Sequence, residues 1–206
     1  MNFLAHVYLA GPGWADRLGA MLGDFVKGPL ASSQDVLPLA VLDGIALHRH
    51  IDSYLDASPA FMRSRTRMAP HFRRVAGIAI DVFYDHFLAA NWANFSGEPL
   101  EAYASGVYDL LDEHAALLPP SLERLRRAMR ADDWLTSYRD VETPELVLDR
   151  MARRLSRPEL LAGAGAELTV HYDGLQEDFF NAMAELAVEI PAWRARRASS
   201  APTVGS

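Results

Sequence analysis

The chain has 206 residues, half of them hydrophobic, which is enough for one packed domain. It contains no cysteine, which excludes disulfides, thiolate nucleophiles and cysteine metal sites and fits a cytoplasmic location. The net charge of −7 argues against nucleic-acid binding, and no apolar run reaches the roughly 18 residues that a membrane span needs.

Apolar residues recur with the helical period, and Gly and Pro punctuate the chain between the periodic stretches. We expect helices over residues 2–10, 14–26, 36–55, 75–92, 100–118, 121–130, 143–155 and 167–190. No alternating run indicates a strand, and no linker divides the chain. We therefore predict an all-α, single-domain bundle over residues 1–191. Pro191 should end the last helix, and residues 192–206 should form a disordered tail.

The helix expected over residues 36–55 carries polar groups on its apolar face. At 100° per residue, His48 and Asp52 fall on the stripe that also holds Leu37, Val41, Ile45 and Leu55. His50 falls on the opposite face. His48 and Asp52 should therefore point into the core together, one turn apart. The structural alternative is a buried neutral histidine that is hydrogen-bonded to Asp52.

The helix expected over residues 75–92 is apolar almost all the way round, which is typical of a buried helix. It nevertheless carries Asp81, Asp85 and His86 in its middle. A buried carboxylate must be paired, protonated or bound to a metal, because burying it alone is very costly. A metal site is one interpretation, and an ion pair with an arginine is the structural alternative.

A basic segment runs over residues 61–74 and contains no acidic residue. Its arginines are Arg63, Arg65, Arg67, Arg73 and Arg74. Such a run is usually a solvated face. The alternative is a docking surface for an acidic partner, with the arginines at 150, 153, 154 and 157 as the next candidates.

Several inward-facing acids and imidazoles come from different helices of the first 90 residues. They are His6, Asp24, His48, Asp52, Asp81, Asp85 and His86. Histidine and aspartate ligands without cysteine suit Mn²⁺, Fe²⁺, Mg²⁺ or Zn²⁺. The chain has no GxSxG sequence and no Gly-rich phosphate loop, so metal-assisted hydrolysis is the enzymatic reaction that the residues favour.

Longer motifs resemble those of the bacterial acyl carrier protein phosphodiesterases. These are NFLAH at residues 2–6, GDFVKG at 23–28, HRHID at 48–52, DVFYDHFL at 81–88, WLTSYRD at 134–140 and HYD at 171–173. The resemblance covers residues 1–191 and implies a divergent relative of the HD metal-dependent phosphohydrolases. It implies hydrolysis of holo-acyl carrier protein by a metal-activated water, which releases 4′-phosphopantetheine and the apo form. The implied cofactor is a divalent metal, first Mn²⁺ and otherwise Mg²⁺ or Fe²⁺, and the implied partner is an acidic carrier protein.

The resemblance also implies the site residues. Asp24, His48, Asp52, Asp85 and His86 are the expected metal ligands. His6 and Asp81 would be further ligands or orienting residues, and His86 or His48 would protonate the leaving serine. The order Asp85-His86 departs from the usual His-Asp order of HD proteins. Two other hypotheses remain: an HD-type phosphohydrolase of nucleotides or small phosphoesters, and a non-catalytic helical binding protein.

Overall fold

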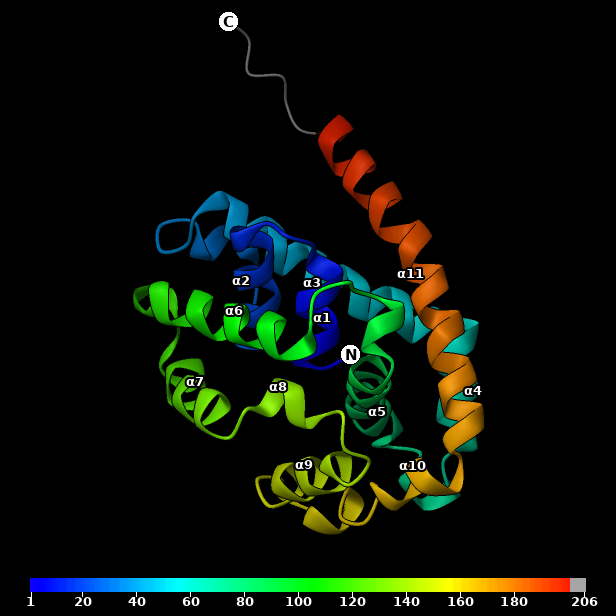
Figure 1. Ribbon diagram of the computed structural model, residues 1–206. Helices are drawn as coiled ribbons and strands as arrows, with labels where there is room; N and C mark the ends of the chain where they lie inside the picture. Colours follow the sequence, from blue (N-terminus) through cyan, green and yellow to red (C-terminus); the bar gives the residue numbers. More distant parts are fainter. Residues whose placement is uncertain (201–206) are drawn as a thin grey trace, which may run out of the picture.

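The structure, a computed structural model, describes residues 1–200, and every regular element in that range is a helix (Figure 1). The α-helices are α1 (Phe3–Ala10), α2 (Trp14–Leu22), α3 (Leu39–Ala57), α4 (Pro59–Arg67), α5 (Ala76–Ala90), α6 (Leu100–Glu113), α7 (Pro120–Ala131), α8 (Trp134–Ser137), α9 (Thr143–Ala152), α10 (Ala166–Val170) and α11 (Tyr172–Ser200). Short 3₁₀ turns are η1 (Leu30–Ser33), η2 (Pro70–Phe72), η3 (Trp92–Asn94), η4 (Ala115–Leu117) and η5 (Pro158–Leu160). The all-α prediction is confirmed. Over residues 1–200, none of the helices has both the length and the apolar character needed to cross a bilayer.

The last helix departs from the sequence prediction, because α11 continues through Pro191 to Ser200. Proline removes one helical hydrogen bond and normally breaks a helix. Here the residues after it have tertiary partners. Trp193 stacks on His50 with ring centroids 5.1 Å apart, and Arg194 donates a hydrogen bond of 2.8 Å to the carbonyl of Ala10. The predicted disordered tail is therefore wrong for residues 192–200, and its remainder, 201–206, lies outside the described residues.

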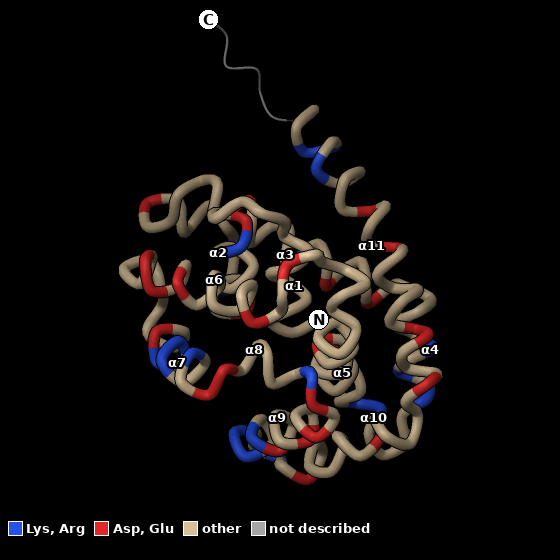
Figure 2. Tube along the Cα trace, viewed as in Figure 1, with Lys and Arg blue, Asp and Glu red and all other residues tan. Residues whose placement is uncertain are grey.

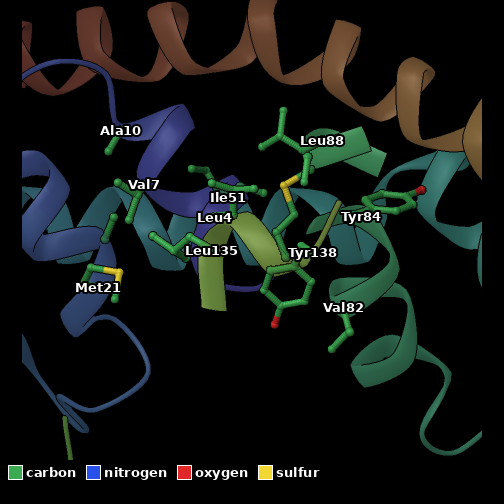
Figure 3. Packing of buried hydrophobic residues seen from close by; sticks show 14 of the residues in the cluster. Leu4, Val7, Ala10, Met21, Ile51, Val82, Tyr84, Leu88, Leu135 and Tyr138 are labelled. Atoms are coloured by element: carbon green, nitrogen blue, oxygen red, sulfur yellow. The ribbon is translucent and has the colours of Figure 1, made fainter. Parts of the chain in front are cut away.

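Helices α1 and α5 lie at the centre of the bundle (Figure 1). α1 packs on α2, α3 and α5, while α11 runs along the side and packs on α3, α4 and α5. The helices from α6 to α9 form the other half, where α6 contacts α7 and α8, and α5 contacts α9. Figure 3 shows Leu4 and Val7 of α1, Ile51 of α3 and Leu135 of α8 within one buried cluster. This arrangement brings α1, α3 and the end of α2 together.

Two glycines allow α2 and α3 to approach closely. A Cβ atom added to Gly19 would lie 2.6 Å from the Cα atom of Gly44, and one added to Gly44 would lie 2.8 Å from the carbonyl oxygen of Asp16. Any side chain at either position would push the helices apart. Because α2 lies so close to α3, the loop that follows α2 meets the middle of α3, where His48 is located.

Candidate metal centre and adjoining pocket

Three of the predicted site residues meet where α1 crosses α3. His6 Nε2 lies 2.9 Å from Asp52 Oδ1, and His48 Nε2 lies 3.2 Å from Asp52 Oδ2. The two imidazole rings stack with centroids 3.7 Å apart. One ligand atom from each residue lies within 4.8 Å of the others. The histidines are buried, but the Asp52 side chain is 42% exposed, so the cluster opens to solvent on one side.

His48 is oriented by a backbone carbonyl. Its Nδ1 lies 2.9 Å from the oxygen of Ala20, and because a carbonyl only accepts, Nδ1 carries the hydrogen and donates. Nε2 then faces Asp52 and, at 3.7 Å, Asp24 Oδ1. A lone pair there would be repelled by both carboxylates, so the position needs a proton or a metal cation. Burial lowers the pKa of His48, but the bonds with Asp24 and Asp52 outweigh it and raise that pKa to about 9.

His6 offers a second imidazole nitrogen. Its ring is buried, and neither nitrogen has an aligned hydrogen-bond partner among residues 1–200, although Nε2 is close to Asp52. Burial lowers the pKa of His6 to about 4, so the ring is neutral. A neutral imidazole with an unused nitrogen beside an ionised carboxylate is the donor that divalent metals take in proteins. The donor set of His6, His48 and Asp52 therefore fits a divalent cation, with Asp24 within reach.

Asp81 adjoins this cluster through the amino group of Met1. That nitrogen lies 2.7 Å from Asp81 Oδ1 and 3.6 Å from Asp52 Oδ1. Burial raises the pKa of Asp81, and the charge of the amino group partly offsets this effect. Asp81 thus lies one contact away from the proposed ligands, and its orienting role stays a prediction.

The loop after α2 is held over His48 by a glycine and an arginine. A Cβ atom on Gly23 would lie 2.1 Å from Cγ of His48, so only glycine leaves room for the ring. Arg49 donates hydrogen bonds of 2.7 Å and 2.8 Å to the carbonyls of Val26 and Gly28. Within the HRHID sequence, His48 thus belongs to the cluster and Arg49 holds the loop that carries Asp24.

A pocket of about 440 Å³ adjoins the cluster and is lined mainly by apolar side chains. It lies between the start of α1, the loop after α2, and helices α7 to α9. Its lining residues are Asn2, Phe3, Asp24, Phe25, Leu125, Asp132, Trp134, Ser137, Tyr138, Thr143, Leu146, Val147, Arg150, Met151 and Arg154. Asp24 belongs both to this wall and to the surroundings of His48, so the pocket adjoins the candidate metal site at Asp24.

A family profile described as acyl carrier protein phosphodiesterase matches residues 1–186. The chain belongs to the acyl carrier protein phosphodiesterase family. A relative of that name from Enterobacter sp. (strain 638) is 34% identical over 190 residues, which cover 92% of this chain and 97% of the relative. Another, from Salmonella agona (strain SL483), is 35% identical over 182 residues, or 88% and 93% of the two chains. No solved structure matches, so the likeness to the HD fold stays a prediction.

Two expected ligands in the family-like motif DVFYDHFL are placed away from the candidate metal cluster. Asp85 is fully buried, and its two oxygens accept the N–H groups of Leu4 and Ala5 at 2.8 Å and 3.0 Å. These donors belong to the first turn of α1, where the helix itself supplies no acceptors. Asp85 therefore holds α1 against α5, and the expectation that it binds metal is not supported by this geometry.

His86 points to the other side of α5. Its Nδ1 donates to the carbonyl of Tyr138 at 2.8 Å, and the hydroxyl of Tyr172 donates to Nε2 at 3.1 Å. Burial lowers the pKa of His86, so it is neutral, and both of its nitrogens are engaged. In this structure His86 connects α5 to the end of α8 and the start of α11, and its expected roles as ligand and as acid stay predictions.

The predicted outward direction of His50 is confirmed, and it contacts the C-terminal helix. Its Nε2 lies 2.8 Å from Glu189 Oε1. The arginine segment also has an internal partner that the sequence analysis missed. Arg63 Nε and Arg67 Nε donate to the two oxygens of the buried Asp178 on α11, at 2.8 Å and 2.7 Å. Two of the five arginines therefore hold α4 to α11. The docking role of Arg65, Arg73 and Arg74 stays a prediction.

Sequence reasoning also missed residues of the pocket, although two family-like motifs contained the signal. Trp134, Ser137 and Tyr138 come from WLTSYRD, and Phe25 follows Asp24 in GDFVKG. Hydrophobic periodicity assigns such residues to the core and cannot indicate a concave surface. Only the tertiary arrangement places them together.

Proposed function

We propose that this protein hydrolyses the phosphodiester of holo-acyl carrier protein and releases 4′-phosphopantetheine and the apo-carrier protein. Membership of the family and the names of the relatives support the substrate and the reaction. The observation that carries the proposal is the cluster of His6, His48 and Asp52, whose potential ligand atoms lie within 4.8 Å of one another, beside a pocket of about 440 Å³ that Asp24 lines. That volume is in the usual range of small-molecule sites.

His6, His48 and Asp52 would hold a divalent cation, with Asp24 as a fourth donor. A cation bound there would polarise a phosphoryl oxygen and would lower the pKa of a water molecule. Mn²⁺ is our first choice, with Mg²⁺ or Fe²⁺ next, because the family resemblance implies them, and mixed imidazole and carboxylate donors are compatible with these ions. Asp85 contributes indirectly, since it fixes the first turn of α1 and thereby the position of His6.

Other residues of the chain would orient the substrate. The apolar wall of Phe3, Phe25 and Leu146 would contact the pantetheine arm and exclude water from it. Tyr138 accepts a hydrogen bond of 2.6 Å from Asn2, so its own hydroxyl hydrogen is available to a phosphoryl oxygen in the pocket. Burial raises the pKa of Tyr138 far above the usual value, so that the hydroxyl keeps this proton.

The deciding experiment is incubation of the protein with holo-carrier protein and Mn²⁺, followed by mass spectrometry of the carrier. We expect loss of the phosphopantetheine group, which stops when a chelator is added. Nucleotides and small phosphoesters are assayed in parallel, and turnover of these alone would favour the other phosphohydrolase hypothesis. A purified protein with no divalent metal and no stabilisation by added metal would favour the non-catalytic binding protein. The cytoplasmic location stays a prediction.

A further inference from the structure

The C-terminal end of α9 and the loop that follows it carry arginines without internal partners. They are Arg150, Arg153, Arg154 and Arg157, and all four are exposed. No acidic residue occurs between positions 150 and 157. None of the four makes an ion pair or a side-chain hydrogen bond with any residue between 1 and 200. Figure 2 shows this basic colour gathered at one end of α9. We call these four residues the α9 arginine cluster.

The segment predicted from the sequence to bind the partner differs in this respect. Arg63 and Arg67 are committed to Asp178, which is 1% exposed. In Figure 2 the basic residues near α4 are accordingly interleaved with acidic ones. Neither α4 nor η2 contributes a residue to the pocket beside the candidate metal site. A partner that docked on α4 would have no direct path from that surface into the pocket.

The α9 arginine cluster, by contrast, borders the pocket. Arg150 and Arg154 line its wall together with Asp24, which lies 3.7 Å from His48. Leu146 precedes Arg150 by one helical turn, lines the same wall and is 57% exposed. The pocket wall therefore combines an exposed leucine with two arginines that make no ion pair within residues 1–200, although Asp24 and Asp132 also line it. An apolar anchor surrounded by charge is the usual composition of a protein-binding surface.

We propose that the α9 arginine cluster and Leu146 form the surface on which an acidic, amphipathic helix of the substrate protein docks. The proposal rests on the proposed function and names the face through which the carrier protein reaches the site. Guanidinium groups pair with carboxylates in fixed geometry, so this surface selects an acidic protein partner. Its position at the pocket lets the attached phosphopantetheine arm enter while the carrier stays bound. The whole chain carries a net charge of −7, which disfavours binding of acidic proteins to most of its surface.

The test compares two triple variants with the same change of charge. One is Arg150→Glu, Arg153→Glu and Arg154→Glu. The other is Arg65→Glu, Arg73→Glu and Arg74→Glu, in the segment that the sequence favoured. Affinity for holo-carrier protein is measured with a chelator present, so that binding is observed without hydrolysis of the carrier. KM and kcat are measured separately with Mn²⁺. Circular dichroism and thermal unfolding confirm that both variants fold, as expected for exposed arginines.

We expect the α9 variant to lose affinity and to raise KM by about tenfold or more at low salt, with kcat largely retained, because charge at an interface rim acts mainly on association. Added salt should weaken wild-type binding and leave the α9 variant almost unaffected. An equal or larger loss in the second variant, or no loss in the first, overturns the proposal. If the wild type binds the carrier through α9 but does not cleave it, the docking surface stands and the proposed function fails. Absence of any binding overturns both.

Discussion

His6 and His48 stack face to face, with ring centroids 3.7 Å apart and an angle of 18° between the ring planes, although they come from α1 and α3. Two protonated rings would repel each other at this distance, so at most one of them carries a charge without a bound metal. His48 is that ring, because Asp24 and Asp52 raise its pKa, whereas burial lowers the pKa of His6. The stack thus places Nε2 of His6, from α1, and Nε2 of His48, from α3, beside the carboxylate of Asp52.

The two histidines of the HRHID sequence should respond differently to substitution. His48→Ala removes a proposed ligand and should abolish release of phosphopantetheine. His50→Ala loses only the contacts with Glu189 and Trp193 on α11 and should keep most of the activity. Initial rates on holo-carrier protein with Mn²⁺ measure both. Loss of activity in His50→Ala but not in His48→Ala would contradict the assigned site.

Asp52 should control stabilisation by metal. A ligand that binds only the folded state raises the free energy of unfolding. The increase is roughly 2.7 kcal/mol when the free ligand concentration is a hundred times its Kd. We expect Mn²⁺ to raise the Tm of the wild type and to leave that of Asp52→Asn unchanged. Asp56→Asn, one turn further on the same helix and exposed, is the matched control and should behave like the wild type. If Mn²⁺ still raised the Tm of Asp52→Asn as much as that of the control, the ligand set would need revision.

Asp85 should affect stability rather than metal binding directly. Asp85→Ala leaves two buried N–H groups of α1 without acceptors, and each such group costs about 1–3 kcal/mol. We therefore expect urea unfolding without metal to show a loss of several kcal/mol. Asp24→Ala is the comparison, because that side chain is 55% exposed and its removal should be almost neutral in the absence of metal. Equal stabilities of the two variants would refute the role of Asp85.

Asp85 shows what the sequence could and could not predict. The apolar helix around it indicated correctly that the carboxylate is buried. The choice between metal, arginine and other partners depended on which groups of the remaining chain approach it. The partners are backbone N–H groups some 80 positions earlier, and backbone groups leave no signature in the sequence. His86 is a similar case, because its partner is the carbonyl of Tyr138.

The periodicity of the helix around His48 was more informative. A helix fixes the relative direction of its side chains, so the inward placement of His48 and the outward placement of His50 followed from spacing alone. The partner of Arg63 and Arg67 could not be found in this way. Asp178 lies on α11, more than 100 positions away, and only packing of α4 on α11 brings them together.

The pH dependence of stability should carry a contribution from Asp85. Burial raises its pKa from the ordinary value of 3.8 to about 7, against the effect of the two N–H donors. Between these two pKa values the folded state binds more protons than the unfolded state. The contribution of Asp85 to the free energy of unfolding is therefore complete below about pH 4, and it is lost as the pH rises to about 7. Asp85→Asn cannot titrate. The difference in unfolding free energy, wild type minus variant, should therefore fall by a few kcal/mol over this window. A difference that is flat or rises with pH would show that the N–H donors outweigh burial.

We expect Gly23 to be essential to the candidate metal centre because a side chain there would collide with the ring of His48. The backbone conformation of Gly23 does not itself require glycine. Its φ of −52° is accessible to any residue, but a Cβ atom there would lie 2.1 Å from Cγ and 2.4 Å from Nδ1 of His48. Gly23→Ala must therefore displace the imidazole from the carbonyl of Ala20 or move the loop that carries Asp24. We expect the variant to remain helical but to lose both turnover and the stabilisation by Mn²⁺.

Gly106→Ala in α6 is the control, since its Cβ atom would meet nothing within 4 Å. That exposed position should gain about 0.5–1 kcal/mol of stability from the better helix propensity of alanine, with activity unchanged. A fully active Gly23→Ala would mean that the loop moves aside without cost, and that the position of Asp24 over His48 is not needed for catalysis.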